Sequence, residues 1–452
     1  MKPETPRDLA LKILDGLPEK SALMDDALDD LFRRHSDLAG RDRAFISHLV
    51  QGVLRWRLRL DWMIKQASDI PLRKITLSVL NVLRLGLYQI FFMDRVPESA
   101  AVNEAVKQAK AAGGRHIGSF VNGVLRSICR RREGIAFPDR DRNLILHLSV
   151  CYSYPEWLVV KWVKEWGEEC AESLLSAGNR IPRLTLRANT LKTERSKVIH
   201  RLAEEGVKAK PSPYSPDGIL VEDFRGRVDQ LKSFGEGLFQ VQDEAAQIPS
   251  PLLDPRPGEM VLDVCAGFGG KATHLAERMG DKGRVLALDI SLKRLTGLVR
   301  NSERLGIDSI TPVAADAARS LSKLFRSPFD RIMVDAPCSG LGVISRHPDI
   351  KWNRGEKDVE RLALLQTAIL NESVSLLRKG GRIFYATCTL SREENEGVVK
   401  SCLARNPGMS VQHLGNHAPG WCLDLIDDQG FLRSLPHVHH MDGFFGALLE
   451  KT

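Results

Sequence analysis

Apolar residues recur at helical spacing from Thr5 to about Cys129, and no β-rich run interrupts them. Examples of the spacing are Leu9, Ile13 and Leu17, and Phe45, Leu49, Val53 and Leu54. Such spacing places apolar side chains on one face of a helix. The most apolar stretch, Leu77 to Met93, is broken by three polar residues, which indicates a buried helix and not a membrane span. We therefore expect an N-terminal all-α helical bundle.

A second pattern follows a charged segment, residues 130–142, whose Pro138 and polar composition are typical of a linker. Residues 155–175 have a helical pattern rich in tryptophan. Strand-like alternation at Leu184 to Ala188 precedes a helical stretch, Glu194 to Glu205, and another short strand, Gly218 to Val221. This order predicts a small α+β module.

From Gly258 onward, short β-rich runs alternate with amphipathic segments. The predicted strands are Met260–Val264, Arg284–Asp289, Thr311–Ala315, Arg331–Asp335 and Arg382–Thr387. Alternation of this kind predicts a parallel, doubly wound, Rossmann-like sheet. The expected fold is therefore a multidomain α and α/β chain, with a helical domain at 1–140, a small α+β module at 145–235 and a catalytic sheet domain at 236–452.

Ligands of doubly wound sheets bind beyond the carboxyl ends of the strands. The first strand runs into a glycine-rich loop, Asp263 to Ala272, and Asp289 ends the second strand, where a carboxylate accepts from ribose hydroxyls. We expect a cofactor that contains a nucleoside. The same glycines fit the fingerprint of NAD enzymes, and a tight turn without a ligand is a further interpretation. Asp316, after the third strand, suits either an adenine amino group or a helix N-cap.

Two cysteines follow the fourth and fifth strands: Cys338 in Asp335-Ala-Pro-Cys and Cys388 in Tyr-Ala-Thr-Cys. Carbon 5 of a pyrimidine becomes nucleophilic only after addition at carbon 6, and a thiolate is well suited to that addition. A second thiol can assist elimination, while Asp335 can hold the amino and ring-nitrogen edge of cytosine. Hydride transfer has no use for two thiols. A metal site at Cys422, His437, His439 and His440 matches no common zinc spacing, so we expect no metal.

Charge and composition refine this picture. The chain has 452 residues and a net charge of +8, and its first 150 residues hold 25 basic and 18 acidic side chains. That excess suits a nucleic-acid surface or an ordinary solvated face. Arg55, Arg57 and Arg59 alternate in sequence and could grip phosphate or form surface salt bridges. The eight cysteines are scattered and the start lacks a signal-peptide core, so we expect a cytoplasmic protein with free thiols.

Several of these segments resemble the RNA cytosine-5 methyltransferases, and most of all the bacterial RsmB (Sun/Fmu) family, which methylates 16S ribosomal RNA. They are DVCAGFGGKATHL, DAPCSGLGVISRHPDIKW, YATCTLSREENE, DGFFGALLEK, GLFQVQDEAAQ and PRLTLRANTLK. The N-terminal motifs RDRAFISHLVQGVLR, LRLGLYQIFFMDRVPESAAVNEAVK and FVNGVLR are similar to the NusB-type domain fused to these enzymes. The resemblance covers essentially the whole chain.

The resemblance implies S-adenosylmethionine as cofactor and 16S rRNA as partner. The cofactor-binding residues that it implies are Cys265, Ala266, Gly267, Phe268, Gly269, Gly270, Lys271, Asp289, Asp316 and Asp335. It also implies Cys388 as the nucleophile and Cys338 as the group that assists product release, with Lys271 and Asp335 completing the catalytic set. Family members commonly carry Ala-Pro where this chain has Gly267-Phe268, which puts the rigidity of the loop in question.

Other functions remain open at this point. The chain could be a non-catalytic RNA-binding or antitermination factor with a retained methyltransferase fold, or an enzyme acting on tRNA or 23S rRNA. A protein or DNA methyltransferase would leave the N-terminal modules without a task. We expect a monomer that does not associate with membranes.

Overall fold

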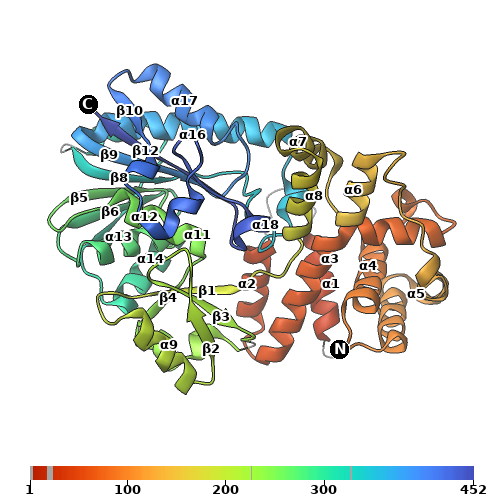
Figure 1. The fold of residues 1–452 in the computed structure, drawn as a ribbon. Helices are drawn as coiled ribbons and strands as arrows, with labels where there is room; N and C mark the ends of the chain where they lie inside the picture. The colour runs from red at the N-terminus through yellow and green to blue at the C-terminus, as the bar shows by residue number, and fades with distance from the viewer. Residues whose placement is uncertain (1–3, 18–23, 225, 326–327) are drawn as a thin grey trace. The chain divides into compact units, whose positions relative to one another are not determined.

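The computed structural model describes residues 4–17, 24–224, 226–325 and 328–452 (Figure 1). It divides into two compact units. The helical unit comprises Met1–Arg180 and Ile344–Gly355, and the sheet unit comprises Ile181–Val343 and Glu356–Thr452. The chain therefore leaves the sheet unit once, contributes a short segment to the helical unit, and returns.

The helical unit confirms the predicted bundle. Its helices are α1 (Pro6–Gly16), α2 (Met24–Arg34), α3 (Gly40–Ala67), α4 (Leu77–Phe92), α5 (Glu98–Arg130), α6 (Leu144–Tyr152), α7 (Glu156–Trp166), α8 (Glu168–Ala177) and α15 (Ile350–Asn353), with 3-10 turns η1 (Leu72–Lys74) and η2 (Arg132–Gly134). Helix α4 is apolar on nearly every side and forms the centre of the core, where Val82, Leu83 and Leu87 are fully buried. The predicted helix at 155–175 is two helices, because Gly167 adopts a left-handed φ of 78° between them.

The arginines at 55–59 differ from the sequence-based expectation. Arg55 is buried and donates to the carbonyl oxygen of Ser345, and Arg59 donates to the carbonyl oxygen of Cys151 at 3.3 Å. The Arg57 guanidinium lies 5.1 Å from the ring centroid of Trp352. Arg55 and Arg57 thus contact the 344–355 segment, and Arg59 contacts α6, so all three cations are engaged within the helical unit. The alternating pattern alone could not reveal these partners.

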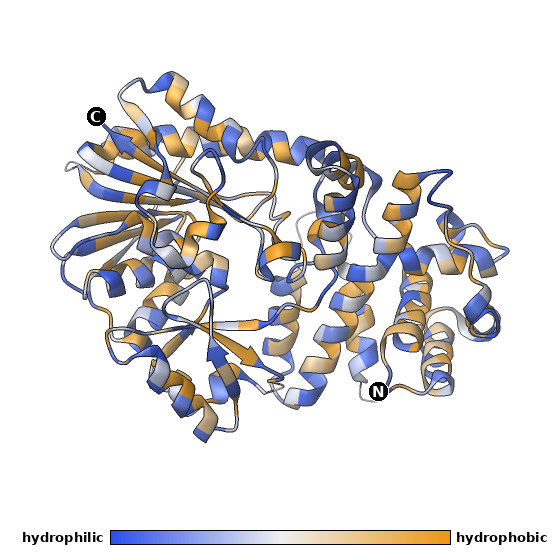
Figure 2. Ribbon diagram, viewed as in Figure 1, coloured by the Kyte–Doolittle hydropathy of each residue, from blue (hydrophilic) through white to orange (hydrophobic). Residues whose placement is uncertain are grey.

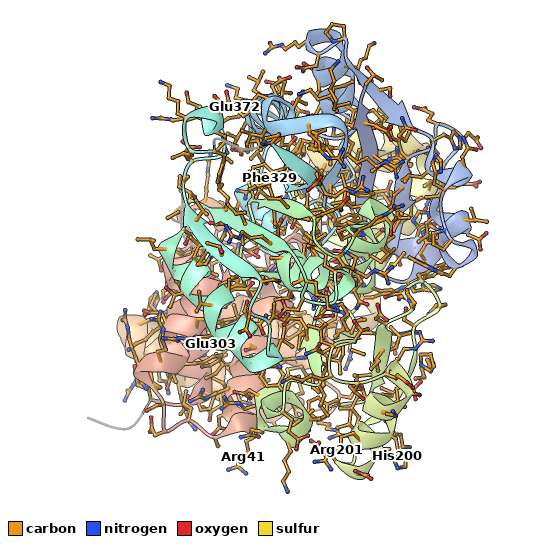
Figure 3. All side chains as sticks on the ribbon, turned by 90° about the vertical axis from the view of Figure 1, so that its left-hand side faces the viewer. Arg41, His200, Arg201, Glu303, Phe329 and Glu372 are labelled. Carbon is orange, nitrogen blue, oxygen red and sulfur yellow. The ribbon has the colours of Figure 1, made fainter. Side chains whose placement is uncertain are left out.

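The small sheet has the strand order β2-β3-β1-β4, with every pairing antiparallel. Its elements are β1 (Leu184–Ala188), α9 (Arg195–Glu204), β2 (Lys208–Pro211), β3 (Gly218–Glu222) and β4 (Phe239–Val241). Helix α9 packs on the sheet through Val198 and Leu202, while His200 and Arg201 lie on its outer side (Figure 3). The predicted α+β module is thus present, and its fourth strand comes from residues after 235.

The large sheet has the order β10-β12-β9-β8-β5-β6-β7, with β11 paired to β12. Its strands are β5 (Met260–Val264), β6 (Arg284–Asp289), β7 (Ile310–Ala314), β8 (Phe329–Asp335), β9 (Leu377–Thr387), β10 (Met409–Gln412), β11 (Leu432–Ser434) and β12 (Phe444–Lys451). All five predicted strands are found, and they pair in parallel. The last three strands were not predicted, and β12 runs antiparallel to β9. The sheet is therefore mixed.

Helices cover both faces of this sheet (Figure 1). One core holds α11 (Glu244–Gln247), α12 (Pro249–Leu253), α13 (Gly270–Arg278) and α14 (Leu292–Leu305), and the other holds α16 (Glu356–Leu376) and α17 (Glu396–Arg405). Figure 2 shows the central strands largely in the colours of apolar residues, as expected for strands buried on both faces. Among the described residues, no helix has the length and apolarity that crossing a bilayer requires.

Candidate active site

The loop from β5 into α13 is held in an unusual backbone conformation. Cys265 has a φ of 66°, and Gly267 and Gly269 have φ of 58° and 83°. A Cβ atom at Gly269 would lie 2.7 Å from Leu298 Cγ, so glycine is required for this approach to α14. At Gly267 nothing lies within 4 Å of the same position. The loop therefore packs closely against α14 at Gly269, whereas the space in front of Gly267 is open.

Asp289, at the end of β6, holds this loop. Its Oδ2 accepts from the Gly267 backbone N–H at 2.9 Å, and its Oδ1 accepts from the Ser291 N–H at 2.8 Å. Each carboxylate oxygen has a further lone pair, so the group can still accept from a ribose hydroxyl. The next residue, Ile290, is 72% exposed, and Phe268 in the loop is 57% exposed. Exposed apolar side chains beside a polar anchor suit a nucleoside.

Asp316 lies two residues beyond β7, in a turn where its Oδ1 accepts from the Ala318 N–H at 3.0 Å. No helix begins there, so the alternative role of helix N-cap does not apply. Asp316 also pairs with the exposed side chain of Arg319 at 3.1 Å. Its place at the same strand edge as Asp289 is compatible with a contact to the base of a nucleoside.

Lys271 and Asp335 form an ion pair at the centre of the edge. The Lys271 Nζ donates to Asp335 Oδ2 at 2.6 Å, and only 8% of the lysine side chain is exposed. Asp263, near the end of β5, is fully buried. Burial and the charge of Asp335 raise the pKa of Asp263 to about 8, against the opposing influence of Lys271. At neutral pH Asp263 therefore holds its proton and adds no charge to the cluster.

The two cysteines predicted to share the site, Cys338 and Cys388, are neighbours in the structure. Strands β8 and β9 are parallel neighbours, and the Sγ atoms of Cys338 and Cys388 lie 3.0 Å apart just beyond their ends. The hydrogen bond with Cys388, together with burial, raises the pKa of Cys338 well above its ordinary value. The two sulfur atoms are therefore close enough for one thiol to donate to the other.

A close backbone approach keeps the cysteine loops together. The Gly342 N–H donates to the carbonyl oxygen of Cys388 at 3.0 Å, and the Gly443 N–H donates to the Gly342 carbonyl at 2.9 Å. A Cβ atom at Gly342 would lie 2.0 Å from the Gly443 oxygen, so no side chain fits there. The loop after β8, the end of β9 and the start of β12 are thus locked to one another.

A buried carboxylate supports the same loops from behind. Glu394 is fully buried and accepts from the Ser339 N–H at 2.8 Å and from Gln366 Nε2 at 2.9 Å, while Thr389 Oγ1 donates to it at 3.3 Å. Burial raises the pKa of Glu394 despite these donors. Glu394 lies in the SREENE segment but was not predicted as a site residue. The available signal was its position six residues after Cys388, within a segment that carries the family resemblance.

Helix α13 is anchored by Arg187 of the small sheet, which is fully buried. Its guanidinium donates to the Gly270 carbonyl at 2.7 Å, to Thr273 Oγ1 at 2.9 Å and to Glu277 Oε1 at 2.8 Å, and it also contacts Gln242. These contacts fix the first turn of α13, which carries Lys271. Arg187 lies in the PRLTLRANTLK motif but was not predicted as a site residue.

Comparison with known proteins identifies the protein family to which this fold and site correspond. Residues 250–450 match the family model described as 16S rRNA methyltransferase RsmB/F, residues 4–130 match the NusB family, and residues 154–226 match the ferredoxin-like domain of RsmF/B-like methyltransferases. A protein from Bacillus subtilis named "Probable ribosomal RNA small subunit methyltransferase B" is 36% identical over 452 residues, all of both chains. One of the same name from Synechocystis is 37% identical over 447 residues, 99% of each chain.

Solved structures agree. NSun6 from Pyrococcus horikoshii, crystallised with the cofactor analogue SFG, has a TM-score of 0.59 and 26% identity over 66% of this chain and 99% of its own. A methyltransferase homologue from the same organism has a TM-score of 0.60 and 28% identity over 69% and 99%. The fold and the glycine loop define an S-adenosylmethionine-dependent methyltransferase. The chain belongs to the RsmB/F family of 16S rRNA methyltransferases.

The predicted family, fold class and cofactor are confirmed by these matches. The residues present also fit the cofactor, because the open space at Gly267, the anchored carboxylate of Asp289 and the exposed Ile290 provide room, a polar partner and an apolar surface. The NAD alternative is therefore set aside. The roles of single residues and the three domain boundaries stay predictions.

Proposed function

We propose that the chain methylates carbon 5 of a cytosine in 16S rRNA through a covalent adduct with Cys388. The observation that carries the proposal is the pair of thiols 3.0 Å apart beside the Lys271–Asp335 ion pair. The family description and the names of the relatives support rRNA as the substrate class. The two-thiol site supports cytosine carbon 5 within that class, because an unreactive ring carbon requires nucleophilic activation.

The side chains divide the chemistry as follows. The Cys388 thiolate adds to carbon 6 of the cytosine. Asp335 holds the amino and ring-nitrogen edge by accepting from its N–H groups, which stabilises the imino form that the addition creates. When bound, S-adenosylmethionine supplies the electrophilic methyl group that carbon 5 takes up. Carbon 5 then loses its proton to the sulfur of Cys338, and the electron pair of the broken C–H bond restores the ring double bond as the bond between carbon 6 and the Cys388 sulfur breaks. Cys338 assists this departure by passing its own S–H proton to the Cys388 sulfur, so both thiols are protonated at the end of the step.

Lys271 positions Asp335 in this scheme. A cation 2.6 Å from Oδ2 keeps that oxygen in place and leaves Oδ1 to meet the substrate. The target base must leave its stack to reach Cys388, so a cytosine in a loop or a splayed position is expected. We further propose that the helical domain at 1–140 and the small module at 145–235 bind RNA, and that the enzyme is a cytoplasmic monomer.

Two cysteine variants test the chemistry. Cys388→Ala should abolish transfer of tritiated methyl groups to unmodified 16S rRNA. Cys338→Ala should accumulate a protein–RNA adduct that survives a denaturing gel, because addition proceeds and release is impaired. Cys402→Ala is the matched control, since this thiol is buried on α17 away from the strand ends. An adduct in Cys388→Ala and none in Cys338→Ala would mean that the roles are reversed.

The substrate is tested with three RNAs. Unmodified 16S rRNA, 23S rRNA and tRNA are incubated with the same enzyme and cofactor, and methylated cytosines are mapped by bisulfite sequencing. We expect one modified cytosine in 16S rRNA. Methyl transfer only to 23S rRNA or only to tRNA would mean that this RNA, and not 16S rRNA, is the substrate. RNA binding without any methyl transfer would favour the non-catalytic RNA-binding factor.

A further inference from the structure

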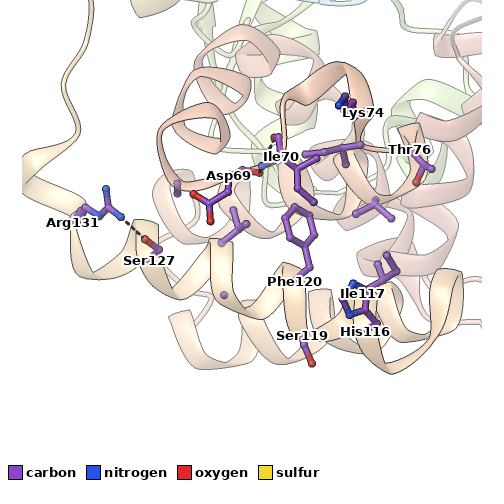
Figure 4. A pocket seen from close by; sticks show the side chains of 16 residues that line it. Asp69, Ile70, Lys74, Thr76, His116, Ile117, Ser119, Phe120, Ser127 and Arg131 are labelled. Atoms are coloured by element: carbon purple, nitrogen blue, oxygen red, sulfur yellow. Dashed lines mark hydrogen bonds between the residues drawn. The ribbon is translucent and has the colours of Figure 1, made fainter.

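A pocket of about 670 Å³ lies within the helical unit, between the end of α3, the η1 turn and the second half of α5 (Figure 4). Its apolar lining includes Ile75, Val79, Ile117, Phe120 and Val124. The volume lies within the range of sites that hold small ligands or parts of larger ones. None of the groups assigned to methyl transfer belongs to this unit, so the pocket has no part in the chemistry proposed above.

The shape of α5 creates one wall of the pocket. The helix is broken at Gly113 and Gly114, where Gly114 has a φ of 78°. The following turns present His116, Phe120 and Gly123 to the pocket. Figure 4 shows the Phe120 side chain pointing from α5 toward Ile70, so an aromatic ring lies at the centre of the lining.

The pocket rim is polar and carries more positive than negative charge. Its charged residues are two cations, Lys74 and Arg131, and a single carboxylate, Asp69, and His116 adds a group that can donate. Within the described part of the chain, the side chains of Lys74, His116 and Asp69 have no hydrogen-bond or ion-pair partner, whereas Arg131 donates to Ser127 Oγ at 2.9 Å. Exposed cations without internal partners are available to a ligand with phosphate groups.

We propose that this pocket binds one unstacked nucleotide of the RNA substrate. The base lies against the Phe120 ring, its phosphates lie beside Lys74 and Arg131, and Asp69 accepts from its N–H groups. Single-stranded RNA is recognised by this combination of an aromatic platform, cations and polar contacts to the edge of the base. The inference rests on the proposed function for its ligand class, because an RNA substrate is what supplies phosphate. An apolar protein side chain fits the lining but leaves the charged rim unused.

Asp69 makes the proposal specific. A carboxylate accepts and does not donate, so it pairs with guanine, whose ring N–H and amino group are adjacent donors, or with the amino groups of adenine and cytosine. Uracil offers one N–H between two carbonyl oxygens, which a carboxylate repels. The pocket is therefore expected to accept guanosine best and uridine least.

Occlusion of the pocket tests the inference in the full-length enzyme. Gly123 lines the pocket, lies in a helix, and has nothing within 4 Å of the position that a Cβ atom would take, so Gly123→Gln should fill the space without strain. Gly16→Gln is the matched control, since Gly16 ends α1 and is equally free of neighbours. We expect Gly123→Gln to weaken binding of unmodified 16S rRNA about tenfold and to raise KM for RNA with kcat unchanged, in the range of one lost stacking contact.

Two variants that each remove one positive charge distinguish RNA binding at the pocket from general electrostatic attraction to RNA. Lys74→Ala should reduce RNA affinity severalfold, while Arg41→Ala, which removes an equal charge, should not. Arg41 is exposed near the start of α3 (Figure 3). The pocket is lined by Ala67 at the opposite end of that helix. Short RNAs that carry either guanosine or uridine at one unpaired position are then compared as competitors of 16S rRNA binding. The guanosine RNA should compete better for the wild-type enzyme, whereas the two RNAs should compete nearly equally for Asp69→Asn.

Two results would overturn the inference. Unchanged RNA affinity in Gly123→Gln would mean that no nucleotide enters the pocket. Loss of activity on assembled small-subunit particles, with normal binding of naked rRNA, would assign the pocket to a protein partner. RNA affinity is measured without methyl transfer, so a failure of the cysteine mechanism would leave this readout intact.

Discussion

Cys338 and Cys388 come from different parallel strands, yet their sulfur atoms lie within hydrogen-bond distance of each other, 3.0 Å apart. They are 50 residues apart in sequence, and the β8–β9 pairing together with the Gly342 approach brings them together. One thiol raises the pKa of the other. The pair therefore behaves as one functional group, and its chemistry should depend on both members.

Because the two sulfur atoms are adjacent, mild oxidation should link Cys338 and Cys388 in a disulfide bond. Hydrogen peroxide can take two electrons and two protons from the thiols, forming a disulfide and two molecules of water. We expect peroxide to inactivate the enzyme and dithiothreitol to restore it, with loss of two hydrogen masses in the peptide pair. Cys338→Ser should lose this reversible response, and Cys402→Ser should keep it. A disulfide between other cysteines, or full activity after treatment, would contradict the pairing.

The buried pair Arg187–Glu277 should contribute strongly to stability. Both side chains are at most 1% exposed, and removal of one partner leaves an uncompensated charge, which costs about 3–5 kcal/mol. We expect Arg187→Met to lower the free energy of unfolding by that amount in urea and to weaken cofactor binding through the Gly270 contact. Arg187→Met combined with Glu277→Gln should recover part of the stability.

Arg195 provides the control for this variant. It donates to the Ser212 and Ser215 carbonyls, and among the described residues it forms no hydrogen bond with α13. Arg195→Met should therefore leave cofactor affinity unchanged. Equal effects of the two substitutions on cofactor affinity would mean that Arg187 acts only through the general stability of the small sheet.

The sequence predicted the strand ends of the large sheet well, because each strand is a compact apolar run and the chemistry follows directly after it. Glycines 267 and 269, Asp289 and both cysteines lie where that rule placed them. Strand β12 was missed because its apolar run contains glycine and ends the chain, and only its antiparallel pairing with β9 makes it a strand.

The buried charges were harder to predict. The alternating pattern of its strand predicts an outward position for Arg187, but Glu277, 90 residues later, supplies the partner that permits its burial. Lys351 would be expected at the surface, yet it is 1% exposed and donates to the Arg55 and Ser153 carbonyls and to Asn179. Burial of a charge depends on partners distant in sequence, and local patterns carry no information about them.

The raised pKa of Asp263 predicts a stability difference with pH. A carboxyl group that binds its proton more tightly in the folded state stabilises the fold below its unfolded pKa, near 3.8, and loses that contribution as pH rises through the folded value of about 8. Asp263→Asn mimics the protonated form at every pH. We therefore expect the wild type to lose thermal stability relative to Asp263→Asn between pH 4 and pH 8. A constant difference in Tm across this range would show that Asp263 is ionised in the fold.

The unusual Phe268 of the glycine loop leads to a final prediction. Its ring lies over Gly297 of α14, where a Cβ atom would be 2.7 Å from Phe268 Cδ1. Gly297→Ala should displace the exposed ring and the loop with it, weakening the binding of S-adenosylmethionine several-fold in calorimetry. The same substitution removes a glycine from a helix interior, which favours folding by about 1 kcal/mol. Lower affinity without lower stability is therefore expected.

Gly123→Ala is the matched control, because it makes the same change in α5 with no neighbour within 4 Å and should affect neither the loop nor cofactor affinity. In a Phe268→Ala background the ring is gone, so Gly297→Ala should no longer change the affinity. If Gly297→Ala binds S-adenosylmethionine as tightly as wild type, Phe268 does not shape the cofactor site. The Gly-Phe pair would then be a neutral replacement for the Ala-Pro common in the family.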